Sequence, residues 1–169
     1  MRSTLLFILT LLVALTAWPA AAEDAGPEAQ GALLPPGIGT LDLGMLESAF
    51  LSSNPLAYKD GNRVGDEAKI CDTIYSIDLR HELWGSPRVG FAHNRLNYVG
   101  LFSLAGHGTR AQYSELFHET SRRLGQPAMA NGDPSTAEQA AIWSVPGRLV
   151  ILTYFNDKGS ESVAYLVTP

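Results

Sequence analysis

Cysteine is almost absent from this chain, and its scarcity limits how the fold can be held together. Cys71 is the single cysteine among 169 residues, so one molecule cannot form a disulfide and its core must hold by packing alone. Three interpretations of Cys71 stay open: a small buried residue, an intermolecular disulfide, or a reactive thiol. Free cysteines in folded proteins are mostly buried, which favours the first. Cys71 also lies too far from the N-terminus to be a lipid-bearing cysteine.

Basic residues are scarce as well. The chain carries 12 Lys and Arg against 17 Asp and Glu, a formal net charge of −5. Arg122 and Arg123 form the one adjacent basic pair, and they fall on a predicted helix. A chain without a basic cluster is not expected to bind nucleic acid or an anionic membrane surface.

Common catalytic and metal-binding motifs are missing too. The sequence has neither the nucleophile elbow of hydrolases nor a phosphate-binding glycine loop. The four histidines, His81, His93, His107 and His118, lack the spacing of structural metal ligands, so no metal and no cofactor is predicted. His107, between two glycines before a predicted helix, could belong to a ligand-binding or catalytic site or to a plain turn. A thiol hydrolase that pairs Cys71 with a histidine is also compatible with the sequence.

The N-terminus carries an apolar run that points to export. Arg2 precedes the apolar residues 5–15, Trp18 and Pro19 interrupt them, and Ala20 to Ala22 supply small residues. This pattern is typical of a bacterial secretory signal cut between Ala22 and Glu23. The alternative is a membrane anchor, for which the run is short. The sequence therefore predicts a signal peptide over 1–22, a periplasmic or secreted protein, and no membrane span after cleavage.

The rest of the chain is predicted to form one domain. Residues 23–36 are small, polar and rich in Pro and Gly, as in a flexible spacer, and the domain is expected over 37–169. Helical periodicity marks residues 43–51 and 113–124, and the second helix opens with Thr109 and Gln112 in a capping box. Alternating or β-rich stretches predict strands at 70–79, 88–92, 95–104, 141–145, 148–155 and 162–167.

The order of these elements suggests an internal repeat. A helix followed by three strands occurs twice, over about 43–104 and 112–168. Antiparallel strands with two helices predict an α+β two-layer sandwich built as a tandem αβββ pseudo-repeat.

Aromatic residues on the predicted strands suggest a binding surface. Helices cover one face of a two-layer fold, and an uncovered face rich in aromatic side chains is typical of a protein-binding surface. The candidates are Tyr98, Phe102, Tyr75, Trp143 and Tyr154. On the strand at 95–104, Val99 and Leu101 are expected to meet the helices, and Tyr98 and Phe102 to face away. The alternatives are that loops cover this face or that the aromatics only pair across strands.

Four short motifs resemble a group of small exported bacterial domains. They are the IGTLDLGM stretch at 38–45, the hairpin at 91–96, the helix and Leu-Gly-Gln-Pro end at 113–127, and the hairpin from Ile142 to Tyr154. Together they resemble BamE/SmpA-like domains and proteins with the β-lactamase-inhibitor-protein-like fold. The resemblance implies a partner protein and a role in envelope assembly or as an inhibitor. The chain departs from these families because it has no cysteine at the cleavage point and cannot form their internal disulfides.

Together these observations predict a soluble periplasmic non-catalytic protein-binding module whose partner is another exported or envelope protein. The alternative is a small periplasmic enzyme or ligand-binding protein with a site near His107.

Overall fold

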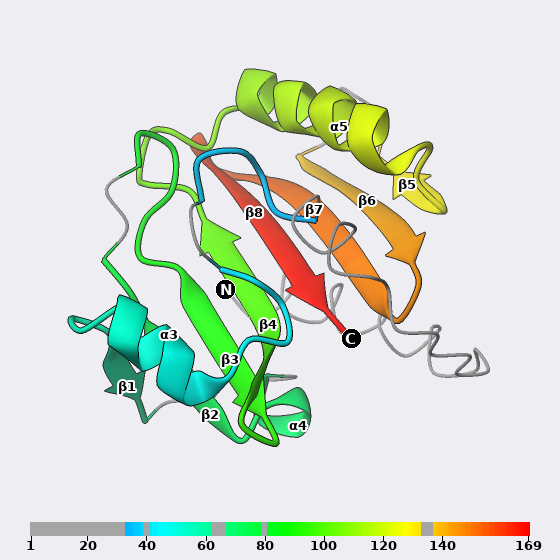
Figure 1. Ribbon diagram of the computed structural model, residues 1–169. Coiled ribbons are helices and arrows are strands. Elements are labelled where there is room, and N and C mark those ends of the chain that lie inside the picture. The colour runs from blue at the N-terminus through cyan, green and yellow to red at the C-terminus, as the bar shows by residue number, and fades with distance from the viewer. Residues whose placement is uncertain (1–32, 39–40, 62–66, 79–80, 133–136) are drawn as a thin grey trace.

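The centre of the molecule is one antiparallel sheet of eight strands, in the order β1-β2-β3-β4-β8-β7-β6-β5 (Figure 1). The computed structural model describes residues 33–38, 41–61, 67–78, 81–132 and 137–169. The strands are β1 (Tyr58–Asp60), β2 (Thr73–Ser76), β3 (Arg88–Ala92), β4 (Arg95–Phe102), β5 (Met129–Asn131), β6 (Glu138–Val145), β7 (Arg148–Asp157) and β8 (Ser160–Thr168). The helices are α3 (Glu47–Ser53), the single turn α4 (Glu67–Ile70) and α5 (Arg110–Leu124).

The strand count corrects the predicted fold. The α+β two-layer sandwich of two αβββ units, with six strands, is wrong, because each half of the described chain contributes four strands to one large sheet. The additional strands, β1 and β5, have three residues each and form the two edges. A segment of three residues is too short to show the alternation of apolar and polar residues that predicts a strand. It is a strand only because its backbone pairs with a neighbouring strand. The two halves meet where β4 pairs with β8.

The helix α5 forms where the sequence predicts it. The hydroxyl of Thr109 accepts a hydrogen bond from the backbone N–H of Gln112 at 3.3 Å, and the Gln112 side chain accepts one from the Thr109 N–H at 2.8 Å. This capping box satisfies two N–H groups that the first turn would leave unpaired. Gly125 ends the helix with φ 85°. The first predicted helix, at 43–51, starts later, at Glu47, because residues before it pair with the backbone of β4 at Leu96.

The main core lies between the sheet and these two helices. Phe50 of α3 packs its ring 5.7 Å from that of Tyr75 and 5.2 Å from that of Phe91. The helix α5 contributes Tyr113 and Leu116 to the same core and packs on β6, β7 and β8. Burial of these large side chains supplies most of the folding free energy, since the chain has no disulfide.

The chain is already packed against the core at Leu33. The carbonyl of Leu33 accepts a hydrogen bond from the Tyr165 hydroxyl at 2.6 Å, and that of Leu34 accepts one from Arg123 at 2.6 Å. Both leucine side chains are buried. The last residues of the predicted spacer, 33–36, therefore belong to the folded part, where the sequence pattern placed its start near residue 37.

The predicted signal peptide, 1–22, and spacer residues 23–32 lie outside the described residues. Among the residues that are described, no helix is long and apolar enough to cross a membrane.

Candidate interaction surface

Strand alternation divides the side chains of the sheet between two faces. The inner face contacts α3 and α5 and includes Val99 and Leu101, which belong to the main core. The outer face lies opposite and includes Tyr98, which belongs to a separate small cluster. The predicted division of β4 is therefore confirmed, with Phe102 alternating onto the outer face beside Tyr98.

The register places one row of outer-face residues across all eight strands. It runs through Tyr58, Ser76, Arg88, Gly100, Leu166, Ile151, Ile142 and Met129. The two end residues, Tyr58 and Met129, are 60% and 40% exposed. The row therefore shows apolar side chains to solvent at both edges of the sheet.

Three of the five predicted partner-contacting aromatics lie on the inner face. Tyr75, Trp143 and Tyr154 are buried in the main core. The Trp143 indole donates to the carbonyl of Gly125 at the end of α5, at 3.0 Å. The Tyr154 hydroxyl donates to Glu161, and that of Tyr75 donates to Glu47 at 2.7 Å. In this fold these three side chains hold the helices on the sheet and have no free ring to offer a partner.

The other two predicted residues, Tyr98 and Phe102, lie on the outer face and differ in exposure. Tyr98 is 5% exposed and Phe102 is 41% exposed. Gly100 stands between them, and a Cβ there would lie 3.0 Å from Cζ of Tyr98 and 3.2 Å from Cε2 of Phe102. Both rings therefore lie against the glycine, and they define an aromatic surface along β4 in which Phe102 is accessible and Tyr98 is buried.

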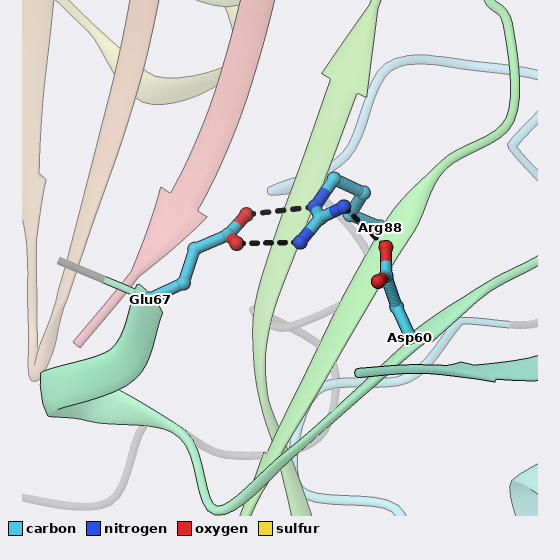
Figure 2. Close-up of polar contacts among 3 residues, drawn as sticks. All are labelled: Asp60, Glu67 and Arg88. Carbon is cyan, nitrogen blue, oxygen red and sulfur yellow. Dashed lines mark hydrogen bonds and ion pairs between the residues drawn. The ribbon is translucent and has the colours of Figure 1, made fainter. Parts of the chain in front are cut away.

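A charged cluster adjoins this aromatic surface (Figure 2). Arg88, which pairs with Gly100 in the register, donates from Nε and Nη2 to the two carboxylate oxygens of Glu67, at 3.0 and 2.7 Å. Its Nη1 donates to Asp60 at 2.6 Å. All three side chains are largely buried, at 21% exposed or less. A two-pronged contact of this kind fixes the guanidinium more firmly than a single surface ion pair does.

The cluster also changes the protonation chemistry of its neighbours. Burial raises the pKa of the Tyr98 hydroxyl, and the negative charge of Glu67 and a hydrogen bond to it raise it further. The hydrogen bond to Glu67 likewise raises the pKa of Arg88, although burial opposes this. Tyr98 therefore keeps its proton and Arg88 its charge at any physiological pH.

The short helix α4 covers one part of the outer face. It carries Glu67, and the residue that follows it, Cys71, packs with Ile74 and Tyr98 in the second hydrophobic cluster. The cysteine is 4% exposed, so the interpretation of Cys71 as a small buried residue is confirmed. Cys71 precedes β2 and packs on the outer face, whereas Tyr75 and Ile77 belong to the main core.

His107 lies apart from this surface, at the turn that leads into α5. It is exposed and lines a pocket of about 530 Å³, together with His81 and three glutamates, Glu82, Glu115 and Glu119. Within the described parts of the chain, no group of three or more His, Cys, Asp or Glu residues could hold a metal ion. Cys71 is not among the described lining residues, so the pocket does not pair His107 with the thiol.

Asp60, Glu67 and Arg88 were missed by sequence reasoning. The two acids lie 28 and 21 residues from the arginine, between the helix predicted at 43–51 and the strand predicted at 70–79, where no element was predicted. No spacing rule links residues so far apart, because the pairing of β1, β2 and β3 brings them together.

No protein-family model, curated protein or solved structure matches the chain. The resemblance to BamE/SmpA-like and β-lactamase-inhibitor-protein-like domains therefore stays a prediction.

Proposed function

We propose that this chain is an exported, non-catalytic module that binds another exported or envelope protein through the outer face of its sheet. The observation that carries the proposal is the exposure of Phe102, a 41% exposed aromatic side chain on the central strand β4. Aromatic side chains are enriched at protein interfaces, where a few of them supply most of the binding free energy.

The surroundings of Phe102 support a binding role. Arg88 is held rigidly next to the aromatic surface, so little side-chain entropy would be lost when a partner packs against it. The neighbour of Phe102 across the strand pair is Ala164, a small residue that leaves the ring accessible. Phe102 is therefore suited to insert into a partner protein, and the ring of Tyr98 lies packed in a fixed position beside it.

The chemistry of this surface supports binding over catalysis. Arg88 is bound to two carboxylates, and the raised pKa of Tyr98 keeps the phenol protonated. Neither group is positioned to exchange protons with a substrate. The N-terminal export pattern and the family resemblance support a periplasmic or secreted location and a role in envelope assembly or inhibition.

Quantitative capture tests the proposal. The immobilised protein is exposed to an extract of the producing bacterium's cell envelope, and captured proteins are measured by mass spectrometry. Phe102→Ala should reduce capture of the specific partner about tenfold, the effect of losing a central anchor. The matched control is Leu51→Ala, which truncates a similarly exposed apolar side chain, 37% exposed, on α3.

Two results would contradict the proposal. One is equal capture by Phe102→Ala and the parent protein, and the other is an equal loss in the Leu51→Ala control. A thermal unfolding curve of each variant must accompany the assay, so that a folding defect is recognised.

A second candidate function is a small periplasmic ligand-binding protein or enzyme with its site near His107. The pocket that His107 lines favours it, because its volume of about 530 Å³ falls within the usual range for small-molecule sites.

A further inference from the structure

A pocket distinct from the one near His107 lies between α5 and the edge strand β5. Its volume is about 580 Å³, within the usual range for small-molecule sites. The first half of α5 forms one wall, residues 130–132 at the end of β5 form another, and Gln139 comes from β6. These segments meet only in the folded protein, because β5 pairs with β6 and α5 packs on β6.

Aromatic rings line the helix wall of this pocket. Tyr113 and Phe117 stack with their ring centroids 6.3 Å apart and their planes 30° from parallel. The imidazole of His118 meets the ring of Phe117 edge-on at 5.7 Å. Ser114 on the helix and Ala130 on β5 are small, so their side chains leave the space between the walls open. A planar aromatic ligand can therefore pack against these rings.

The hydroxyl of Tyr113 is a donor that forms no hydrogen bond with any described residue. The side chain lines the pocket and is only 8% exposed. By contrast, the buried hydroxyls of Tyr75, Tyr154 and Tyr165 each donate to an oxygen atom of the protein. Burial is the cause that raises the pKa of Tyr113 to about 12, so the phenol keeps its proton at physiological pH. A buried donor without a partner costs free energy, which an acceptor oxygen of a ligand would recover.

The charge of the lining favours an anionic acceptor. Arg110 contributes a positive charge, and the described lining contains no aspartate or glutamate. The guanidinium carbon of Arg110 lies 4.9 Å from the centre of the Tyr154 ring, and that ring lies 6.1 Å from the ring of Tyr113. This cation–π contact places the positive charge on the same side of the pocket as the Tyr113 phenol. Hydrogen bonds to a carboxylate are stronger than those to a neutral acceptor.

We infer that this pocket binds a small aromatic carboxylate, with its ring against Phe117 and its carboxylate facing the Tyr113 hydroxyl and Arg110. An inorganic anion would leave the aromatic wall unfilled, and an aromatic amine would meet the like charge of Arg110. The inference goes beyond both candidate functions, because neither Phe102 nor His107 belongs to the described lining.

Titration of the purified protein with sodium benzoate tests this inference. The NMR signals of the His118 imidazole and the Gln139 side-chain amide report binding at the pocket. Three further probes are titrated in parallel: benzamide is the neutral analogue, cyclohexanecarboxylate is the anion without an aromatic ring, and sodium sulfate is the simple anion. Benzoate should shift both signals saturably and bind more tightly than any of the other three.

The decisive variant is Tyr113→Phe, which removes only a hydroxyl that no described residue uses. It should fold like the parent protein and bind benzoate about tenfold more weakly, the effect of losing one hydrogen bond to a charged group. The matched control, Tyr58→Phe, removes the same atom from a 60% exposed tyrosine on β1, at the opposite edge of the sheet. It should bind benzoate like the parent protein.

A second pair of variants tests the charge. Arg110→Gln should weaken benzoate binding and leave the weak binding of benzamide unchanged. Arg122→Gln makes the same change in net charge at an exposed position on α5 outside the described lining, and it should have no effect.

Saturable binding of benzoate that Tyr113→Phe weakens and Tyr58→Phe retains would support the inference. It is overturned if benzoate gives no saturable shift, if benzamide or cyclohexanecarboxylate binds equally well, or if Tyr113→Phe binds like the parent protein. Equal shifts with sulfate would mean an adventitious ion only and would also overturn it. None of these results involves Phe102, so the outer-face proposal is judged separately.

Discussion

The contact between Gly90 and Cys71 allows a quantitative test of how the outer face is packed. Gly90 is buried in β3 under Cys71, and a Cβ there would lie 2.9 Å from Cδ1 of Ile74, 3.2 Å from Cβ of Cys71, and hard against its Sγ. Overpacking of this kind costs about 1–3 kcal/mol. Gly90 is not among the glycines with positive φ, so alanine also restricts the unfolded chain, which offsets about 0.4–1 kcal/mol. Gly90→Ala should therefore destabilise the protein by about 1–2 kcal/mol.

A second substitution should relieve this clash. Cys71→Ala removes the Sγ that alanine at position 90 would meet, and by itself it costs about 1 kcal/mol because it leaves a small cavity. In the double variant the new methyl group occupies that cavity. The double variant should therefore be more stable than the sum of the two single effects predicts, by about 1–2 kcal/mol.

Urea unfolding of the four proteins, followed by tryptophan fluorescence, measures this coupling. The parent protein should also react slowly with a thiol reagent until urea is added, because Cys71 is buried. Additive effects, within about 0.5 kcal/mol, would refute the packing described. Rapid labelling of the native protein, or a disulfide-linked dimer on a non-reducing gel, would refute the buried position of Cys71.

The remaining predictions concern export, alkaline stability and Tyr98. Cell fractionation followed by N-terminal sequencing should find a chain that starts near Glu23 in the periplasm or medium, and a full-length chain in the inner membrane would contradict this. Burial raises the pKa of Tyr113 to about 12, and burial with a hydrogen bond to Glu47 raises that of Tyr75 to about 12. Because both values lie above the ordinary 10.0, their contribution to stability is complete below about pH 10 and is lost as the pH rises through 12. In the parent protein the urea midpoint should fall as the pH rises from about 10 to about 12, and Tyr75→Phe should make this fall smaller. An unchanged fall would contradict a contribution of Tyr75 to the loss of stability. Tyr98→Ala should lower the free energy of unfolding by about 3 kcal/mol. A free energy of unfolding within about 0.5 kcal/mol of the parent protein's would show that the Tyr98 ring is not packed.

Local sequence signals predict the elements that local interactions stabilise. The cap at Thr109 and the glycine at 125 mark α5 at both ends, and the structure has both. The strands predicted at 88–92 and 95–104 leave only His93 and Asn94 for the turn between them, and both residues have the positive φ values that a two-residue hairpin turn needs. These features depend on neighbours within a few residues, so they can be read from a short stretch of chain.

Long-range pairing explains what the sequence could not predict. The edge strands β1 and β5 exist because β2 and β6 offer them unpaired backbone groups. The pairing of β4 with β8 joins residues more than 60 positions apart and determines that the two halves form one sheet. The charged cluster at Arg88 depends on the same pairings, so it was missed together with β1.

Alternation predicted that Tyr98 and Phe102 share a face, but not which of the two reaches solvent. Tyr98 and Phe102 lie on one strand and one face, four residues apart. The helix α4 and Cys71 pack over the first, and Glu67 ties that helix to Arg88. Phe102 lies beyond the reach of this packing, beside Ala164, and stays exposed. The position of one helical turn therefore separates a stabilising aromatic from an accessible one. Loss of Tyr98 should act first on folding, whereas loss of Phe102 should act first on binding.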